Sequence, residues 1–257
     1  MARLAIEDIA AVRIVRPEDI VPAAEALHEV AMAHGMRAAP AHDIADKRTP
    51  VDMDGNLLAS SVFGWTGDDR VWWRNSRIAL ESPITLACRF QDEPFWVNAQ
   101  GFRTRVPNRY FDEIDLTNFE HRAMTRAAIV IPVHMAFGQI GAVSFNPVDR
   151  DRTDLAKEFE ELADLFGIFA RTFLVSYVMV MGAMQALPPR SRLSKREVEC
   201  LRWAAIGKTD LEISMIMSRS RATVRFHIQN ASAKLDAVNR SQTVFKAAQL
   251  GYISVVR

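Results

Sequence analysis

Cysteine is scarce in this chain, which has only Cys88 and Cys200 among its 257 residues. Two distant cysteines cannot form the disulfide framework of a small secreted domain, and this composition favours a reducing compartment. No signal peptide is expected, because Glu7 and Asp8 interrupt the apolar residues near the N-terminus. The sequence therefore predicts a cytoplasmic protein.

Long apolar runs are lacking too. A membrane-spanning helix needs about 20 predominantly apolar residues with almost no charge. Residues 166–184 come nearest, but Arg171 lies inside this stretch, and Gly167, Ser176 and Gly182 dilute it. We expect no membrane span.

The signatures of common enzymes are missing. The chain has no P-loop, no G-x-G-x-x-G fingerprint and no nucleophile elbow. His28, His34 and His42 are spaced too irregularly for one helix face and lack a neighbouring cysteine, so they do not form a metal-binding motif. The sequence predicts neither an enzyme nor a bound metal or organic cofactor.

The net charge of +1 conceals a strong asymmetry. Residues 190–257 contain 13 Lys and Arg against 5 Asp and Glu, a local charge of +8, whereas the remaining residues carry 19 against 26, or −7. This division indicates a basic C-terminal domain that meets a polyanion, attached to a domain that does not. Pro188 and Pro189 favour an extended connection between them. We expect a sensing domain over 1–185, a linker over 186–192 and a DNA-binding domain over 193–257.

The N-terminal domain shows a mixed pattern. Apolar residues at helical spacing predict a helix over 17–33 and a long one from Thr153, as its cap, to about Met184. Four short β-prone runs lie at 60–63, 84–88, 127–133 and 141–145. Strands flanked by helices predict an α+β fold, here an α-β-α sandwich followed by an all-α four-helix domain. The C-terminal half of the long helix is apolar nearly all round, which fits either a subunit interface or packing inside its own domain.

Capping signals divide the C-terminal domain into helices. Ser194 and Glu197 form a capping box, Gly207 suits a left-handed C-cap, and Thr209 or Asp210 caps a second helix. Ser220 is expected to cap a third helix, and Ser241 to begin a fourth that ends at Gly251. Val198, Leu201 and Ala205 are expected to face inward from the first helix. The second helix carries Leu211, Ile213, Ile216 and Met217, and the third has the buried seam Val224, Ile228, Ala231 and Leu235.

Two short helices, a tight turn and a third helix predict a helix-turn-helix whose recognition helix enters the major groove. Arg225 and Gln229 lie opposite the buried seam, flanked by Phe226 and Asn230, and these side-chain types suit base reading. Other residues suit phosphate contacts: Arg219, Arg221, Thr223, Lys234 and Arg240. A basic helical bundle that binds nothing would explain the combination of charge, caps and face composition poorly.

This segment resembles the DNA-binding domain of LuxR-type regulators along its full length. The matching residues are Leu193, Arg196, Glu197, Leu201, Gly207, Lys208, Thr209, Glu212, Ile213, Thr223, Val224, His227, Asn230, Lys234, Leu235, Asn239, Arg240, Leu250 and Gly251. The resemblance implies a four-helix domain that binds an inverted repeat of double-stranded DNA as a homodimer, with base contacts from Arg225, Phe226 and Gln229. It leaves His227 as a packing or phosphate-side residue.

The N-terminal domain is similar to the autoinducer-binding domain of the quorum-sensing members, which bind N-acyl homoserine lactones. The matching stretches are Trp73, Ser82-Pro83-Ile84, Pro94-Phe95-Trp96, Ile129, Ile131-Pro132, Gly138, Gly141 and Ser144-Phe145. The resemblance implies a ligand site that includes Trp73, Ser82, Trp96, Ala128 and Ser144, in which the Trp96 indole suits the polar head of a ligand.

Several site residues depart from the family pattern. Ser82 stands where the family has the Asp that accepts the ligand amide N–H, Trp73 replaces a tyrosine, Asp69 a tryptophan and Ala128 a glycine. A serine hydroxyl offers only a neutral hydrogen bond, whereas a carboxylate offers a charge-assisted one. The ligand is thus an acyl lactone or another small molecule; alternatively, the domain binds no ligand and serves dimerisation or protein interaction. The aromatic residues fit an ordinary core equally well.

Overall fold

The computed structural model describes residues 6–45, 49–66, 80–182 and 192–254. It divides into two compact units, one drawn from Met1–Ala183 without the turn Ala136–Gly138, the other made mainly of Met184–Arg257. Each unit is described by itself. The predicted linker, 186–192, lies outside the described residues except for Arg192.

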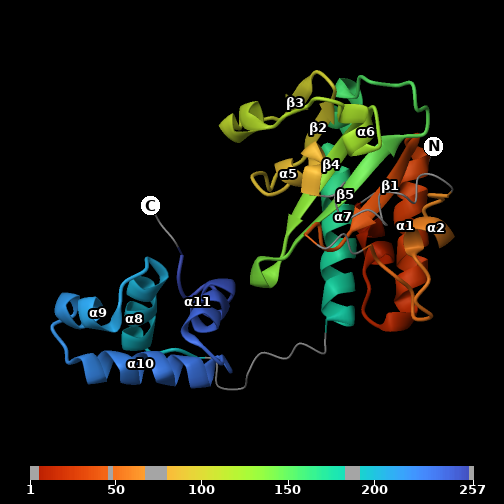
Figure 1. The fold of residues 1–257 in the computed structure, drawn as a ribbon. Helices are drawn as coiled ribbons and strands as arrows, with labels where there is room; N and C mark the ends of the chain where they lie inside the picture. The colour runs from red at the N-terminus through yellow and green to blue at the C-terminus, as the bar shows by residue number, and fades with distance from the viewer. Residues whose placement is uncertain (1–5, 46–48, 67–79, 183–191, 255–257) are drawn as a thin grey trace. The chain divides into compact units, whose positions relative to one another are not determined.

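A five-stranded antiparallel sheet forms the centre of the N-terminal unit (Figure 1). Its spatial order is β1-β5-β4-β2-β3. The strands are β1 (Met36–Ala41), β2 (Phe95–Asn98), β3 (Gly101–Arg103), β4 (Ala127–His134) and β5 (Ile140–Pro147). The central strands β4 and β5 are buried along most of their length, so both faces of the sheet must be covered.

Helical segments cover both faces. On one face lie η1 (Ile6–Val12), η2 (Pro17–Asp19), α1 (Ile20–Ala33), α2 (Leu58–Ser61) and α7 (Ala156–Met181). Its core includes the rings of Phe145 and Phe166, which stack with centroids 4.0 Å apart. On the other face lie α5 (Pro83–Ala87), η4 (Arg109–Glu113) and α6 (Phe119–Ala123). The short turn η5 (Ala136–Gly138) joins β4 to β5.

This arrangement confirms the predicted α+β class and the strands at 127–133 and 141–145. It also corrects three details. The runs 60–63 and 84–88, expected as strands, fall in and beside the helices α2 and α5. Thr153 does not cap the long helix, which begins at Ala156 after Leu155. Pro83 at the first position of α5 explains one error, because proline is well accommodated at a helix N-terminus.

Among the described residues, α7 is the one helix that could cross a membrane by length and composition. It packs on the sheet and α1, however, and buries Phe159, Phe166, Phe169 and Phe173 there. One side of α7 thus belongs to the core of the N-terminal unit. The opposite side stays exposed: Ile168 and Met179 are exposed, Met179 by 69%, and Val175 between them is half-buried.

Within residues 192–254, the C-terminal unit has four helices: α8 (Lys195–Ala205), α9 (Asp210–Ile216), α10 (Arg221–Lys234) and α11 (Arg240–Gln249). Caps predicted from the sequence are present. Ser194 and Thr209 both form capping boxes, Ser220 caps α10, and Gly207 has φ +87°. The fourth helix begins one residue early, at Arg240 with Asn239 as its cap.

The buried seam of α10 is confirmed, since Val224, Ile228, Ala231 and Leu235 are all buried. They pack against α8, α9 and α11 in two adjoining clusters. Leu211 and Ile216, two of the apolar residues of α9, are exposed. Two turns of helix are too short to bury every apolar residue, and Ile213 with Ser214 occupies the inner side.

A buried ion pair joins α8 to α10. The Glu197 carboxylate accepts hydrogen bonds from Lys234 Nζ at 2.9 and 2.8 Å and from the Ser194 backbone N–H at 2.6 Å. Burial raises the pKa of Glu197, but the hydrogen bonds from Lys234 and Ser194 outweigh it and leave this pKa below its usual value. The carboxylate is therefore charged at neutral pH and holds the two helices together.

Glu197→Gln should destabilise the C-terminal unit by about 1.5–3 kcal/mol at pH 7, since it removes charge-assisted hydrogen bonds from a buried site. Hydrogen exchange of α8 and α10 amides in the full chain measures this loss locally. Because the folded-state pKa is lowered, the stabilisation is present above the ordinary value of 4.5 and is lost as the pH falls below it. The difference in the free energy of unfolding between the wild type and Glu197→Gln should therefore become smaller as the pH falls below 4.5.

Glu199→Gln is the matched control. Glu199 pairs with Arg196 at 2.7 Å on the exposed surface of the same helix, and such pairs contribute about 0–1 kcal/mol. Equal losses from the two variants would contradict a special role for Glu197.

Candidate functional site

One side of α10 is exposed along its whole length. Arg225, Phe226 and Gln229 are exposed and lie opposite the buried seam, and Arg221 is exposed at the first residue of the helix. Phe226 is 57% exposed, although aromatic side chains are usually buried. Arg225, Phe226 and Gln229 thus form a continuous outer row of a cation, an aromatic ring and an amide.

The start of α10 is defined by hydrogen bonds. Ser218 turns the chain with φ +51°, and Ser220 Oγ then accepts a hydrogen bond from the Thr223 backbone N–H at 3.1 Å. The Thr223 hydroxyl lies 2.8 Å from the Ser220 hydroxyl, so it belongs to the cap. Asn230 is half-buried, and His227 meets the Phe226 ring edge-on at 5.8 Å between centroids.

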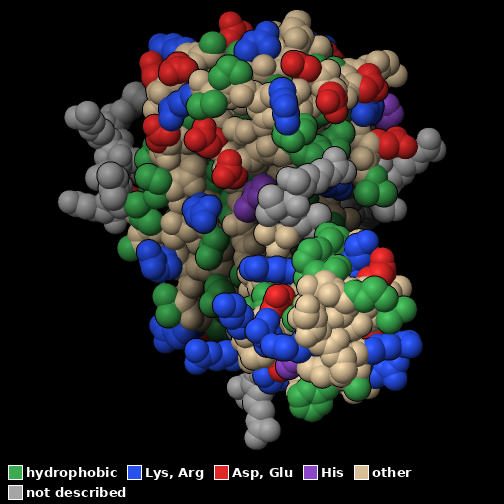
Figure 2. Space-filling view, turned by 90° about the vertical axis from the view of Figure 1, so that its left-hand side faces the viewer, with side chains coloured by type: hydrophobic (Ala, Val, Ile, Leu, Met, Phe, Trp, Pro, Cys, Tyr) green, Lys and Arg blue, Asp and Glu red, His purple; other side chains and the backbone are tan. Residues whose placement is uncertain are grey.

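The cations predicted to contact phosphate divide into two groups. Arg219 and Arg221 are exposed and form no ion pair within the described residues. Lys234 and Arg240 are half-buried and engaged inside the unit, Lys234 by Glu197 and Arg240 by Asp210. Figure 2 shows Lys and Arg side chains gathered on the part of the C-terminal unit that faces the viewer.

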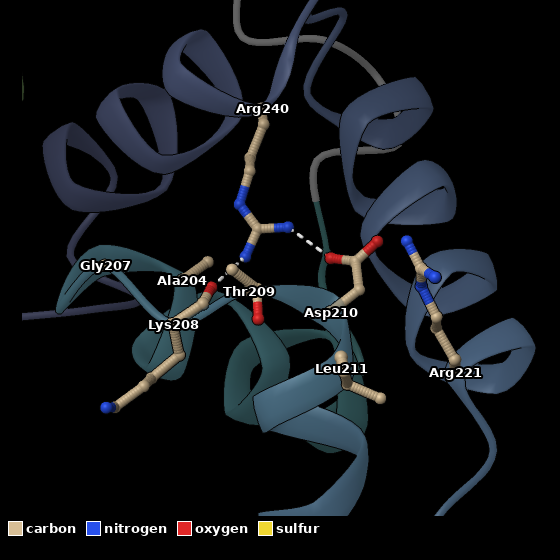
Figure 3. A pocket seen from close by; sticks show the side chains of 8 residues that line it. All are labelled: Ala204, Gly207, Lys208, Thr209, Asp210, Leu211, Arg221 and Arg240. Atoms are coloured by element: carbon tan, nitrogen blue, oxygen red, sulfur yellow. Dashed lines mark hydrogen bonds and ion pairs between the residues drawn. The ribbon is translucent and has the colours of Figure 1, made fainter.

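A pocket of about 550 Å³ lies where α9, α10 and α11 begin. Its lining includes Lys208, Asp210, Arg221 and Arg240; in Figure 3 the guanidinium groups of Arg240 and Arg221 point toward the Asp210 carboxylate, whereas the Lys208 ammonium points away. Arg240 donates to the Lys208 carbonyl at 2.7 Å and is ion-paired with Asp210. From the sequence, Asp210 is expected only as a helix cap, and its ion pair with Arg240 is not predicted. An acidic residue at a helix start within a basic domain is the sequence signal that could have indicated such a pair.

Lys208 is neutralised by a neighbour. Hydrogen bonds from the Thr209 backbone and hydroxyl, and from Lys208, lower the pKa of Glu212 to about 2. Glu212 therefore stays charged across the physiological range and holds Lys208 at 3.2 Å. Glu212 of the α9 capping box thus also neutralises the charge of Lys208.

Three of the predicted ligand-site residues lie on one side of the sheet in the N-terminal unit. Ala128 and Ser144 belong to neighbouring strands and point to the face covered by α5, and Ser82 is the N-cap residue of that helix. Ser82 is 1% exposed, and its hydroxyl has no hydrogen-bond partner among the described residues. A buried hydroxyl without a partner is unusual and needs an explanation.

Trp96 lies on the opposite face. It pairs with Ile129 across β2 and β4 and packs in the core beneath α1 and α7, with the Arg103 guanidinium 5.9 Å from its ring centroid. The sheet therefore separates Trp96 from Ser82, Ala128 and Ser144. Trp73 and Asp69 lie outside the described residues.

The three histidines lie against aromatic rings. His28 lies 6.1 Å from Phe63, His34 lies 6.0 Å from Phe166, and His42 lies 5.2 Å from Tyr177, measured between ring centroids. Within the described ranges, no group of three His, Cys, Asp or Glu side chains could hold a metal ion. Burial raises the pKa of the two free thiols, to about 12 for Cys88 and about 11 for Cys200.

Known proteins resemble both units. Residues 191–247 match the family described as bacterial regulatory proteins, luxR family. The quorum sensing-dependent transcriptional regulator RpaR of Rhodopseudomonas palustris is 39% identical over 200 residues, which cover 74% of this chain and 73% of RpaR. The transcriptional activator VanR of Vibrio anguillarum is 36% identical over 129 residues, and this match covers only about half of either protein, 50% and 52%.

The fold is also found in a solved structure. The crystal structure of SdiA from Escherichia coli superposes with a TM-score of 0.52 at 20% identity, covering 97% of this chain and 96% of SdiA. With the exposed row on α10, the helix-turn-helix and the extended similarity to RpaR, these findings establish that the chain belongs to the LuxR family of quorum-sensing-type transcription regulators.

Proposed function

We propose that this chain is a cytoplasmic, homodimeric transcription regulator that reads DNA with α10 and responds to a small-molecule signal, without enzymatic activity of its own. The observation that carries the proposal is the exposed row of Arg225, Phe226 and Gln229 opposite the buried seam of α10. RpaR, a relative over most of the chain, is named as quorum sensing-dependent.

Each side chain of the row has a counterpart in the major groove. Arg225 can donate two hydrogen bonds to guanine, Gln229 can pair with adenine, and Phe226 can pack on a thymine methyl group. Asn230 lies at the edge of this surface. Arg219 and Arg221 carry unneutralised charge at the start of the helix and suit phosphates, together with the Thr223 hydroxyl. Lys234 and Arg240, being paired internally, serve mainly to hold the helices in place.

The exposed side of α7 supports a homodimer. Ile168, Val175 and Met179 lie on the side of α7 that faces away from the sheet, with the exposed Arg171 and the half-buried Thr172 between the first two. A twofold interface places the same surface of two copies against each other, and the exposed apolar side chains on this side suit such a contact. Two identical DNA-binding units would then read an inverted repeat with half-sites about one helical turn apart.

The buried hydroxyl of Ser82 supports a ligand. It lies on the same side of the sheet as Ala128 and Ser144, and a ligand N–H could supply the partner that the described residues do not. An N-acyl homoserine lactone has a suitable amide, and a different small molecule with a hydrogen-bond donor would serve as well.

A ligand-independent regulator is the competing proposal. Trp96, expected to meet the polar head of a ligand, lies in the core on the far side of the sheet from Ser82. With Trp96 acting as ordinary core, the N-terminal unit could serve only dimerisation or protein interaction.

The first test separates base reading from phosphate contact. Arg225→Ala should cost about 1–3 kcal/mol at a selected site and relax its preference at one base pair. Arg221→Ala should weaken binding to all duplexes and flatten the salt dependence. Titrations on matched and scrambled duplexes at several salt concentrations measure both effects. Identical behaviour of the two variants would refute the assignment.

The second test concerns assembly. Met179→Glu should weaken the dimer at least about tenfold, because a twofold axis brings two like charges together at the interface. Sedimentation velocity of the full chain at tens of micromolar measures it, since a dimer with a Kd of ~1 μM persists there. Phe90→Glu is the control, because Phe90 is exposed and stacks on Tyr110 of η4, on the face of the sheet opposite α7. A wild-type monomer would place the interface elsewhere.

The third test concerns the ligand. Ser82→Asp should strengthen acyl-lactone binding by about 1–2 kcal/mol, roughly ten- to thirtyfold, because a carboxylate accepts the amide N–H in a charge-assisted bond. Ser82→Ala should weaken it. Calorimetric titration with lactones of increasing chain length measures the affinities of the wild type and the two variants. Submicromolar binding to the wild type would show that serine is no handicap, and no binding to any variant would favour the ligand-independent regulator.

A further inference from the structure

Asp210 lies among cations at the DNA-facing end of the C-terminal unit. It is the one carboxylate among the eight residues that line the pocket of Figure 3, beside Lys208, Arg221 and Arg240. A negative charge here faces the polyanion that the unit is proposed to bind. The negative charge of Asp210 therefore lowers the affinity for DNA, and this residue is expected to have another role that offsets the loss.

The two oxygens of Asp210 hold different arginines. Oδ1 is ion-paired with Arg240 at the first residue of α11, and Oδ2 lies 3.8 Å from Nε of Arg225 in α10. Arg240 is fixed on its other side by the Lys208 carbonyl, at 2.7 Å. The chain of contacts runs from Lys208 through Arg240 and Asp210 to Arg225, so the starts of two helices, α9 and α11, converge on one side chain of α10.

We infer that Asp210 is a positioning residue for Arg225 and thereby determines base specificity. This inference rests on the proposed base-reading role of Arg225. Asp210 approaches the guanidinium from its Nε side, which leaves both Nη groups available for bidentate donation to guanine. Asp210 is 19% exposed and anchored, whereas Arg225 is 57% exposed and would otherwise sample many rotamers.

Restricting Arg225 before binding lowers the entropy that it must lose on DNA. Ordering a long side chain costs about 0.5–1.5 kcal/mol, which corresponds to a roughly two- to tenfold effect on binding. That gain applies only where Arg225 meets its correct base. The repulsion between Asp210 and phosphates applies to every sequence. Asp210 therefore raises the ratio of specific to non-specific binding while lowering non-specific affinity.

The start of α9 does not need the Asp210 side chain as a cap. Thr209 caps this helix, and Glu212 completes the capping box by accepting hydrogen bonds from the Thr209 backbone N–H and hydroxyl at 2.8 and 2.9 Å. The helix start is thus satisfied without the Asp210 carboxylate. A neutral residue there removes the ion pair with Arg240 but leaves the hydrogen bond from Arg240 to the Lys208 carbonyl in place, so thermal unfolding is measured beside DNA binding.

The experiment uses the full chain and compares Asp210→Asn, Arg225→Ala, the double variant and Glu199→Gln. A site is first selected from random duplexes with the wild type; binding is then measured to this site, to its single-base variants and to an unrelated duplex. Glu199→Gln removes one exposed negative charge from the same unit without touching Arg225. Asp210→Ser replaces Asp210→Asn if thermal unfolding shows the latter to be misfolded.

Asp210→Asn should reduce the preference at the Arg225-dependent base pair about two- to tenfold. Binding to the unrelated duplex should become stronger, and the preference should fall no further when Arg225 is already alanine. An unchanged base preference in Asp210→Asn, an equal change in Glu199→Gln, or the same loss in the Arg225→Ala background would overturn the inference. If Arg225→Ala itself keeps every base preference, the proposed role of Arg225 fails instead.

Discussion

The buried carboxylate of Glu197 fixes how α10 lies in the C-terminal unit. It closes the capping box of α8 through Ser194 and pairs with Lys234 in the last turn of α10, so the start of one helix is tied to the end of the other. Apolar packing alone resists rotation of α10 only weakly, because hydrophobic contacts are not directional. The ion pair between Glu197 and Lys234 requires a defined geometry and therefore restricts this rotation. With Val224 buried and Lys234 held, α10 presents its outer row in one orientation.

A comparable constraint governs the N-terminal unit. Side chains alternate between the two faces of a strand, so neighbouring residues of β2 and β4 belong to different cores. Ala128 therefore faces α5, while Ile129 and its partner Trp96 face α7. A motif read along the sequence takes no account of this alternation. The match that grouped Trp96 with Ser82 is sound as a family signal, yet the sheet lies between the two side chains.

Features that depend on residues close together in the sequence could be predicted, and features that depend on distant residues could not. Caps and the seam of α10 depend on residues within a few positions of each other, and Ser194, Ser220 and Val224 were predicted correctly for this reason. β1 was missed because its sequence, MRAAPA, has little β propensity; its proline is tolerated because β1 lies at the edge of the sheet. The ion partners Lys234 and Arg240 could not be predicted, since their carboxylates lie 37 and 30 residues away.

Ion pairs within the C-terminal unit determine where its local charge of +8 is available to attract DNA. Glu197, Glu199 and Glu212 neutralise cations away from the outer row of α10, on the flanks and beneath it. Arg219 and Arg221 are among the cations of residues 192–254 that form no ion pair, and both lie at the start of α10. Unpaired positive charge at the start of this helix helps to orient the protein on DNA as well as to attract it. The acidic residues of the basic unit thus shape its interface by deciding which arginines DNA can reach.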